Sequence, residues 1–588
     1  WVQFYTYLEL NDNFDKKKLE DGITELYLEH NKQNGDPESE YKFELQALKD
    51  IHTKSNYKNE VGKIINGNYL TILQIISIFI LMVSGFNYIY FSYTRILSNS
   101  TDYGIKRVYG ANNVSFLSQH LFESLIIHFI ALFVSVVAIN FLRQIPGLLE
   151  GFISFSDLPE KFWISLLLIF LISTIINPVI LLIMLGRKST IVLLSQNFST
   201  HHNTFSFRTI FTITQFVIIV FLISSIIGIN KQVNFLKNRD KGIDIENILI
   251  IKTPGNMRRP SRMVKNLEAF EQEIAKIAGV NSVAHSDKIP GEVPTFTFSA
   301  SEREENLGIK AAVFIAGNEF FESFRIDLLK GEGFNQLDKN DCIINSTCMK
   351  QLGYNSPDDI IGRTVFLKDG SMMQTIKAGI TGVCEDFNFI DAKEKPGPII
   401  LVDWTKDLIL GNYSLSINPQ ADKQKLLSKI EFLFYNTFPN YPFEFFWLEE
   451  FYNKQFKEEN SIVKNLRVFA LVAILLGILS LLSMVLHISI ARTKEIGIRK
   501  VYGAKKSDII KLLNLGFTRW IVIASILAVP LSLLFLKNWL NAFAYKTNIS
   551  IWLFLISIGT AFFIGIVTVT IQSLKVANKN PIESIKYE

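Results

Sequence analysis

Seven apolar stretches constrain the fold of this chain more than any other feature of its sequence. A helix needs about 20 apolar residues to cross a hydrocarbon core about 30 Å thick. Buried helices of soluble proteins rarely run that far without a charged residue. The stretches are Tyr69–Tyr93, Phe116–Leu142, Phe162–Leu185, Thr209–Ile229, Val468–Ile490, Trp520–Leu536 and Ile551–Ile571. The sequence therefore predicts a polytopic α-helical membrane protein, in agreement with its positive mean hydropathy of +0.24.

Lys and Arg residues in the short loops predict which side of the membrane each loop faces. The net charge is only +5, which disfavours a nucleic-acid partner. The loop after Val468–Ile490 is the most basic one, and three more loops on the same side carry positive charges. The residues are Lys106, Arg107, Arg187, Lys188, Arg492, Lys494, Arg499, Lys500, Lys505, Lys506, Lys511, Lys575, Lys579 and Lys586. This side is predicted to be the cytoplasm, so the long insertion 230–465 is predicted to be extracytoplasmic.

The insertion 230–465 has the pattern of a folded α/β domain. Residues 247–252 ("NILIIK") and 295–300 ("TFTFSA") are strand-like. Apolar residues from Met263 to Ile277 recur at helical spacing before Gly279, a helix-ending residue, and 423–438 is again helical. The "KDGS" at 368–371 predicts a hairpin turn. More than 200 residues suffice for one or two small domains, whereas the first 67 residues are too few for an equivalent one.

Two copies of one short basic phrase divide the chain into repeats. "DYGIKRVYGANN" begins at Asp102 and "EIGIRKVYGAKK" begins at Glu495. Six of the eight residues from Gly104 and from Gly497 are identical, and the other two exchange Lys and Arg. Each copy follows one apolar stretch and precedes two more, which predicts two versions of one three-helix unit. Since 209–229 precedes the second outer domain, symmetry predicts a further span upstream of Trp1.

The repeated phrase predicts a short helix with one apolar stripe. Ile498, Val501 and Tyr502 stand at i, i+3 and i+4, and flanking glycines allow the chain to turn into and out of the helix. A basic loop that only fixes topology would not need identical uncharged residues, so we favour two docking surfaces for two copies of a partner. The candidate docking residues are Asp102, Gly104, Ile105, Lys106, Arg107, Val108, Tyr109, Gly110, Glu495, Ile496, Gly497, Ile498, Arg499, Lys500, Val501, Tyr502 and Gly503.

Signals for enzyme chemistry are weak in this sequence. No GxxxxGK[ST] phosphate loop, HExxH or GxSxG motif occurs, and "GRKST" at 186–190 lacks the upstream glycine. The adjacent His201 and His202 have no nearby ligands. Cys342 and Cys348 could pair if oxidised, although unpaired structural thiols, Cys384 included, are the favoured interpretation. We expect no catalytic site, no metal and no cofactor in this chain.

Three ionisable residues stand out within the predicted spans. They are Glu123 and His128 in the second span and His487 in the fifth. Intramembrane ionisable groups are candidates for function. Glu123 is close enough to the cytoplasmic end to reach the interface, and the sequence reveals no partner for a proton relay on another helix. An ion pathway is therefore the less favoured interpretation.

The chain resembles the FtsX-like or MacB-like permeases of ATP-binding-cassette systems, also called mechanotransmission transporters, in the long duplicated form common in Bacteroidetes. The resemblance rests on the repeated phrase, on "NPIESIKYE" at the C-terminus, and on "CIINSTCMKQLGY", "IIGRTVFL" and "ITGVCEDFNF" in the insertion; "LQALKDIHTKS" is similar to the end of a first outer domain. It implies that 101–112 and 494–505 are coupling helices, and that the outer domain is a porter-plus-Sabre-like module. Asp102 and Tyr103 depart from the usual Glu-Ile pair, so the first docking surface is expected to differ from the second.

The resemblance implies an inner-membrane permease that works with a cytoplasmic ATPase homodimer, which would carry the ATP and Mg²⁺. A periplasmic adaptor is a further expected partner. The alternative is a non-transporting regulator of an extracytoplasmic partner such as a cell-wall hydrolase. A secondary transporter with a midplane site is disfavoured, because the spans contain few charges and few Gly- or Pro-broken helices. The expected domains are 1–67, 68–186, a linker at 187–207, a span at 208–229, 230–465, 466–574 and a tail at 575–588.

Overall fold

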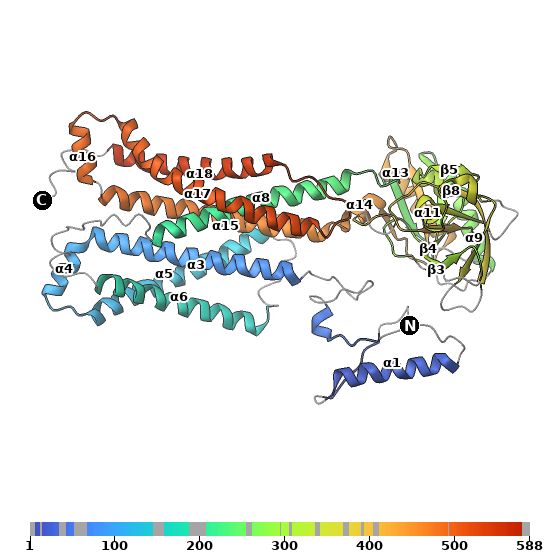
Figure 1. The fold of residues 1–588 in the computed structure, drawn as a ribbon, viewed down its shortest axis with the longest axis horizontal. Helices are drawn as coiled ribbons and strands as arrows, with labels where there is room; N and C mark the ends of the chain where they lie inside the picture. Colours follow the sequence, from blue (N-terminus) through green and yellow to red (C-terminus); the bar gives the residue numbers. More distant parts are fainter. Residues whose placement is uncertain are drawn as a thin grey trace. The chain divides into compact units, whose positions relative to one another are not determined.

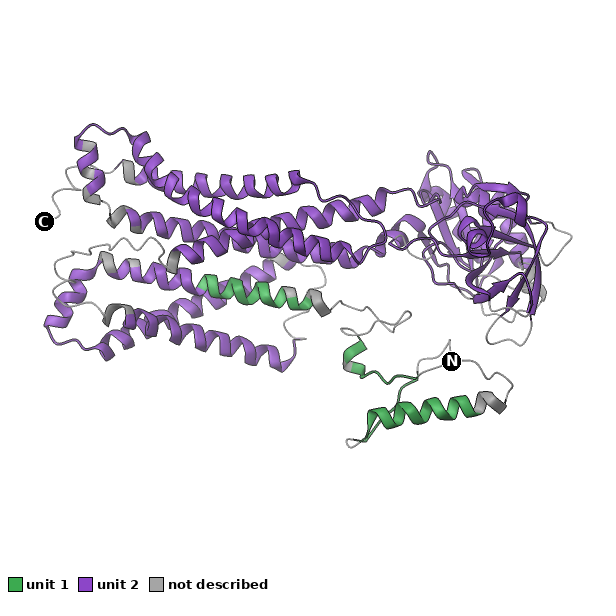
Figure 2. Ribbon diagram, in the orientation of Figure 1, with its two compact units in different colours: residues 1–84 green, residues 85–588 purple. Residues whose placement is uncertain are grey.

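The computed structural model divides the chain into two compact units, residues Trp1–Ser84 and Gly85–Glu588 (Figure 2). The residues that it describes are 6–11, 14–33, 43–51, 67–144, 158–186, 207–254, 261–294, 296–304, 308–334, 341–368, 375–389, 393–403, 411–491 and 493–578.

Besides the first part of the helix that begins at Gly67, the described residues of the first unit form one amphipathic helix and a short segment bound to it. Helix α1 (Lys16–Gln33) is followed by a 3₁₀ turn, η1 (Leu48–Asp50). The backbone N–H of Leu45 donates to the Glu20 carboxylate at 2.7 Å, and the rings of Tyr27 and Phe43 meet edge to face at 5.1 Å. These contacts tie the segment before η1 to the side of α1.

Seven described helices are long and apolar enough to cross a membrane, and they confirm the seven predicted spans. They are α3 (Gly67–Ser98), α5 (Asn113–Arg143), α6 (Glu160–Gly186), α8 (Phe207–Asn238), α15 (Lys457–Ala491), α17 (Lys506–Leu540) and α18 (Ile551–Ala577) (Figure 1). The largest difference concerns α17, which begins at Lys506 instead of Trp520. Lys511, Asn514 and Arg519 interrupt its apolar pattern, so the sequence prediction missed about four helical turns at its start.

Helix α8 packs against α15, α17 and α18 in the second membrane segment. Small residues allow this close approach. The Ser224 and Ser532 hydroxyls are 2.8 Å apart, and a Cβ on Gly228 would meet the side chain of Leu536 at 2.7 Å. Half of the residues in the most apolar part of α8 are buried by neighbouring elements, compared with 6% of those in the most apolar part of α5. In the first segment, α5 packs against α6, and Ile89 and Ile96 of α3 pack on Leu181.

The smaller sheet of the outer domain has four antiparallel strands in the order β11-β1-β10-β2. They are β1 (Ile248–Lys252), β2 (Val280–Ser286), β10 (Asn412–Ile417) and β11 (Phe445–Trp447). Helices α9 (Ser261–Ala275) and α13 (Lys423–Thr437) share one core with the sheet, in which Phe270, Tyr413 and Phe434 are almost fully buried. Alternation along β1 places Leu249 and Ile251 in that core.

The larger sheet closes on itself. It contains β3 (Phe296–Ser301), β4 (Ile309–Ile315), β5 (Leu328–Gly331), β6 (Asp341–Asn345), β7 (Thr364–Lys368), β8 (Thr375–Cys384) and β9 (Ile399–Val402). Strand β7 pairs with β3 at one side and with β8 at the other, so that β8, β6, β9, β4, β3 and β7 form a ring. Strand β5 adds to β8 outside the ring. Short helices α10 (Glu319–Phe324), α11 (Ser346–Gln351), α12 (Pro357–Ile360) and α14 (Leu448–Lys454) complete the domain.

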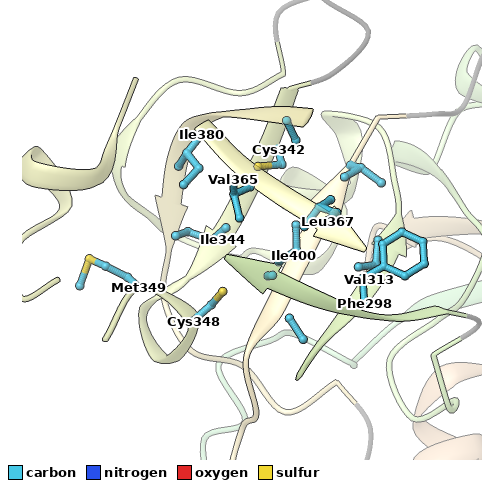
Figure 3. Close-up of a cluster of buried hydrophobic side chains, with 14 of the residues drawn as sticks. Phe298, Val313, Cys342, Ile344, Cys348, Met349, Val365, Leu367, Ile380 and Ile400 are labelled. Carbon is cyan, nitrogen blue, oxygen red and sulfur yellow. The ribbon is translucent and has the colours of Figure 1, made fainter. Parts of the chain in front are cut away.

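Aliphatic side chains and two cysteines fill the core of this ring (Figure 3). Val313, Ile344, Val365 and Ile400 are at most 1% exposed. Cys342, Cys348 and Cys384 are free and buried, as the structural-thiol interpretation expects. Burial raises the pKa of Cys348 and Cys384 to about 12, so these thiols stay protonated at neutral pH.

The sequence located most of the outer-domain elements correctly. Strands β1 and β3 and helices α9 and α13 lie where the patterns placed them, and β7 and β8 form the expected hairpin. The tip of that hairpin, 369–374, lies outside the described residues. Gly279 has a positive φ of 103°, but α9 ends at Ala275, so this glycine turns the chain into β2 instead of capping the helix.

Polar contacts join the outer domain to the outer ends of the membrane helices. The buried Gln232 amide of α8 donates to the Tyr545 carbonyl at 2.7 Å and accepts from the Thr547 N–H at 2.9 Å. Lys393 of the outer domain forms an ion pair at 2.8 Å with Glu459 of α15, whose side chain is 9% exposed. We call these contacts the juncture; they link α8, α15, the α17–α18 loop and the outer domain.

Candidate partner-docking site

The two repeated phrases form two short helices between membrane spans. Helix α4 (Ser100–Val108) connects α3 to α5, and α16 (Thr493–Val501) connects α15 to α17; each has nine residues. Four of the candidate spans separate α4 from α16 along the chain. An even number of crossings returns the chain to the side from which it started, so both helices face the same side of the membrane.

Both helices end in the same left-handed glycine turn. Gly110 has a φ of 92° and Gly503 a φ of 88°. The N–H of Ala111 donates to the Lys106 carbonyl, and that of Ala504 to the Arg499 carbonyl, each at 2.9 Å. This is the six-to-one hydrogen bond of a Schellman cap, which needs a residue that accepts positive φ. The two predicted exit glycines therefore have a structural reason.

The predicted apolar stripe is exposed to the same extent in both copies. Ile105 and Ile498 are 46% and 45% exposed, Val108 and Val501 are 68% and 67%, and Tyr109 and Tyr502 are both 88%. Three large apolar side chains therefore point away from the protein at each helix. Exposed apolar patches of this kind mark interaction surfaces in proteins.

The opposite face of each helix anchors it to the membrane segment. Ile496 of α16 is 4% exposed and packs with Ile488, Ile509 and Leu513. In α4, Gly104 is buried, and Tyr103 packs with Ile96 and Leu181. The inner faces fix both helices in place and leave the stripes available.

Several of the charged candidate residues have partners close by in the sequence. Arg499 pairs with Glu495 at 2.8 Å within α16, while Lys106 donates to Gln119 and Arg107 to Asn113, both at 3.3 Å. Asp102 lies in the first turn of α4, and Gly497 and Lys500 belong to α16. The structure thus gathers the predicted residues on two helices, whereas their role in partner binding stays a prediction.

A polar cluster behind α4 was missed by the sequence analysis. Glu123 of α5 forms an ion pair with Arg95 of α3 and lies 3.5 Å from His120, whose ring nitrogen is 3.4 Å from the Tyr103 hydroxyl. Glu123 thus has the partner on another helix that the sequence did not reveal. The signal was present, because an alignment of the two repeats beyond the phrase places Arg95, His120 and Glu123 opposite Ile488, Leu513 and Gly516.

The remaining candidate residues do not form a second site in the part of the chain that is described. His128 bonds to the Ser124 carbonyl of its own helix at 2.8 Å and packs against Tyr88 and Phe170. No group of three His, Cys, Asp or Glu side chains that could hold a metal occurs among the described residues. His201, His202, most of "GRKST" and the C-terminal motif lie outside them.

Known proteins are similar to this chain in both its membrane and outer regions. It is 24% identical over 341 residues to "Macrolide export ATP-binding/permease protein MacB" of Escherichia coli and to "MacB 2" of Escherichia coli O1:K1 / APEC; each match covers 55% of this chain and 51% of the relative. The chain thus spans about half the length of the curated relatives it matches.

Two solved structures are similar to part of this chain. The periplasmic region of MacB from Actinobacillus actinomycetemcomitans is 11% identical, with 37% of this chain and 96% of that chain covered and a TM-score of 0.27. A domain of a putative permease from Porphyromonas gingivalis is 15% identical, with 34% and 88% covered and a TM-score of 0.25.

The family model "FtsX-like permease C-terminal" matches the chain twice, at residues 74–189 and 467–581. Each match contains one three-helix segment and one of the two docking helices. The second match begins 393 residues after the first, the spacing of the repeated phrases. The matched segments and the seven spans together show a multi-pass protein of the inner membrane that contains two FtsX-like permease segments.

Proposed function

We propose that this permease works with a separate cytoplasmic ATPase dimer that docks on α4 and α16. ATP hydrolysis by that dimer moves the outer domain, which exports or extracts a substrate at the outer face of the inner membrane. The observation that carries the proposal is the matched exposure of the two apolar stripes. A nucleotide and its Mg²⁺ bind to the partner, and this chain contributes docking and movement instead of chemistry.

Two matched stripes suit a symmetric partner. The commonest soluble oligomers are two-fold dimers, which present the same surface patch twice. Burial of a large apolar side chain contributes about 1.5–3 kcal/mol, so three residues at each helix can supply a stable contact. A chain with both docking helices needs no second copy of itself, and we expect one chain for each ATPase pair.

The juncture supports the second half of the proposal. Helix α15 ends at Ala491, next to the start of α16, and its other end carries Glu459, which pairs with the outer domain. Helix α8 also reaches the juncture, through Gln232. A displacement of α16 therefore has a continuous path of helix and buried polar contacts to the outer domain.

The test is binding of the ATPase to the full chain in nanodiscs. The ATPase is first identified by mass spectrometry of proteins that co-purify with the chain from native membranes. Ile498→Asp places a charge in the docking contact, and an unpaired charge at a buried contact costs several kcal/mol. We expect the affinity to fall at least about tenfold. Ile105→Asp should act in the same direction, with a smaller loss.

Leu329→Asp is the matched control, because Leu329 of β5 has the same 45% exposure as Ile498 but lies in the outer domain. It should leave ATPase binding unchanged. If Ile498→Asp binds the ATPase and stimulates hydrolysis like the unmodified chain, the stripes are not docking surfaces and the proposal fails.

A further inference from the structure

The two docking helices rest on chemically different supports. Behind α4 lie Arg95, Tyr103, His120 and Glu123, which we call the positioning cluster. Behind α16, the equivalent residues are Ile488, Ile496, Leu513 and Gly516. The outer stripes match closely, so the difference between the copies is concentrated on the hidden side of each helix.

The positioning cluster connects three helices through consecutive side chains. Arg95 of α3 pairs with Glu123 of α5, and Glu123 lies 3.5 Å from Nδ1 of His120. Nε2 of His120 lies 3.4 Å from the hydroxyl of Tyr103 in α4. His120 is only 6% exposed, and its ring stacks on that of Tyr103 with 5.9 Å between centroids. His120 is therefore the link between α4 and the two spans.

We propose that His120 is a positioning residue that holds α4 in its docking orientation only while its ring is neutral, so that the first docking helix responds to protons and the second does not. The inference deepens the proposed function, because it concerns the orientation of one of the two docking surfaces. It predicts a difference between α4 and α16 that can be measured on the chain alone.

The hydrogen-bonding capacity of imidazole explains the dependence on protonation. A neutral ring with its proton on Nδ1 donates to Glu123 and accepts from the Tyr103 hydroxyl. A second proton turns Nε2 into a donor, so the Tyr103 hydroxyl has to reverse its role and accept from the ring, which then carries a positive charge. Histidine is the side chain whose charge most often changes between about pH 5 and 8.

The surrounding charges add to this effect. Arg95 from α3 and Lys106 from α4 are cations near the ring; Asp102 of α4 and Glu123 of α5 are the anions, and Glu123 is already paired with Arg95. From α6, the packed residues Ile180 and Leu181 are apolar. A protonated His120 would therefore add a third cation to a site with two anions, one of which is already paired with Arg95, and α4 would loosen.

The test uses a nitroxide label at the same position of each helix, on the full chain in nanodiscs without any ATPase. Tyr109→Cys and Tyr502→Cys are a matched pair, since both tyrosines are 88% exposed and the three native cysteines are buried. We expect the electron paramagnetic resonance spectrum of the label on α4 to show at least twofold faster motion at pH 5.5 than at pH 8. The spectrum of the label on α16 should not change.

His120→Gln separates titration from structure. A glutamine amide can donate to Glu123 and accept from Tyr103, but it has no proton to gain in this range. In this variant the label on α4 should be as immobile at pH 5.5 as it is at pH 8. Tyr103→Phe removes the other end of the link, and the label should then be mobile at both pH values.

Two results would overturn the inference. The first is a label on α4 whose mobility does not change with pH in the unmodified chain. The second is an unchanged pH response of that label in the His120→Gln variant. Since no ATPase is present, neither result bears on docking itself. Failure of the Ile498→Asp test would likewise leave the measured pH response intact.

Discussion

Single charged residues distinguish two docking surfaces whose apolar stripes are alike. Lys505, Lys506 and Lys511 are exposed beside α16, and the equivalent residues beside α4 are Asn112, Asn113 and Ser118, also exposed. The side chains of Asn112 and Asn113 are used locally, by Ser115 and Arg107. The second surface therefore presents three more positive charges to a partner than the first.

These lysines should make binding at α16 sensitive to salt. The triple variant Lys505→Asn, Lys506→Asn, Lys511→Ser should weaken ATPase binding about threefold to 150-fold in 50 mM salt, because each of the three exposed charge pairs contributes about 0.2–1 kcal/mol. In 0.5 M salt the difference should nearly vanish through screening. The reciprocal variant Asn112→Lys, Asn113→Lys, Ser118→Lys is the control, and it should strengthen binding in low salt. An equal loss at both salt concentrations would contradict a role of the charges.

A second residue-scale prediction concerns Glu271 of α9 in the outer domain. Burial raises the pKa of its carboxyl to about 7, and the like charges of Glu319 and Glu268 add to the shift. The folded state then binds the proton more tightly than the unfolded state. Stability is therefore greatest below the unfolded pKa of about 4.5 and falls as the pH rises through 7, by about 1–3 kcal/mol.

Glu271→Gln removes this loss. We expect the variant to melt at a higher temperature than the unmodified chain at pH 8 and at the same temperature at pH 4.5, as followed by tryptophan fluorescence. Glu431→Gln, on an exposed position of α13, is the control and should change neither value. A variant that gains as much stability at pH 4.5 as at pH 8 would show that the carboxyl charge is not the cause.

At the scale of elements, the glycine turns after α4 and α16 give each docking helix a fixed end. No atom lies within 4 Å of a Cβ built on Gly110 or Gly503, so space does not explain these glycines. Their positive φ explains them, because a residue with a Cβ is destabilised by about 1–2 kcal/mol in this conformation.

Gly503→Ala should therefore loosen the end of α16 without a steric clash. Hydrogen exchange of the amides in 493–502 should become about fivefold faster, the factor that corresponds to about 1 kcal/mol. Gly516→Ala is the matched control: it also meets no atom within 4 Å, but it lies inside α17 with helical φ, where alanine is favoured. Equal exchange rates in the two variants would exclude the cap as the cause.

The seven spans and the docking helices could be predicted because their signals are local. Length and hydropathy define a span, and the phrase around Glu495 contains both the stripe and its terminal glycine. The closed ring of strands could not be predicted, since the contact of β7 with β3 depends on residues more than 60 positions apart, such as Ser299 and Lys368. The positioning cluster was missed for the same reason, because its four side chains come from α3, α4 and α5.

For the whole molecule, the proposed function requires the juncture to couple the membrane helices to the outer domain. Lys393 and Glu459 form its buried ion pair, with side chains 20% and 9% exposed. Loss of one partner leaves a buried charge and costs about 3–5 kcal/mol, whereas replacement of both by apolar residues is often tolerated.

Glu459→Gln should therefore uncouple the two parts. We expect normal ATPase binding in nanodiscs, but no ATP-dependent change in hydrogen exchange of the outer-domain strands. The double variant Lys393→Met, Glu459→Met should restore that change, and Glu450→Gln, on an exposed position of α14, should have no effect. An ATP-dependent change that persists in Glu459→Gln would show that the ion pair does not transmit the movement.

Helix α15 has one further consequence for the amplitude of movement. It is 35 residues long, with no proline inside, and joins the region of α16 to the juncture as one rod of about 52 Å. A rod of this length works as a lever: a tilt of about 10° at the cytoplasmic end carries the other end sideways by about 9 Å, with no bending of the helix. If the ATPase docks as proposed, a small rearrangement at α16 would thus become a larger movement at the outer domain, in proportion to the length of the helix.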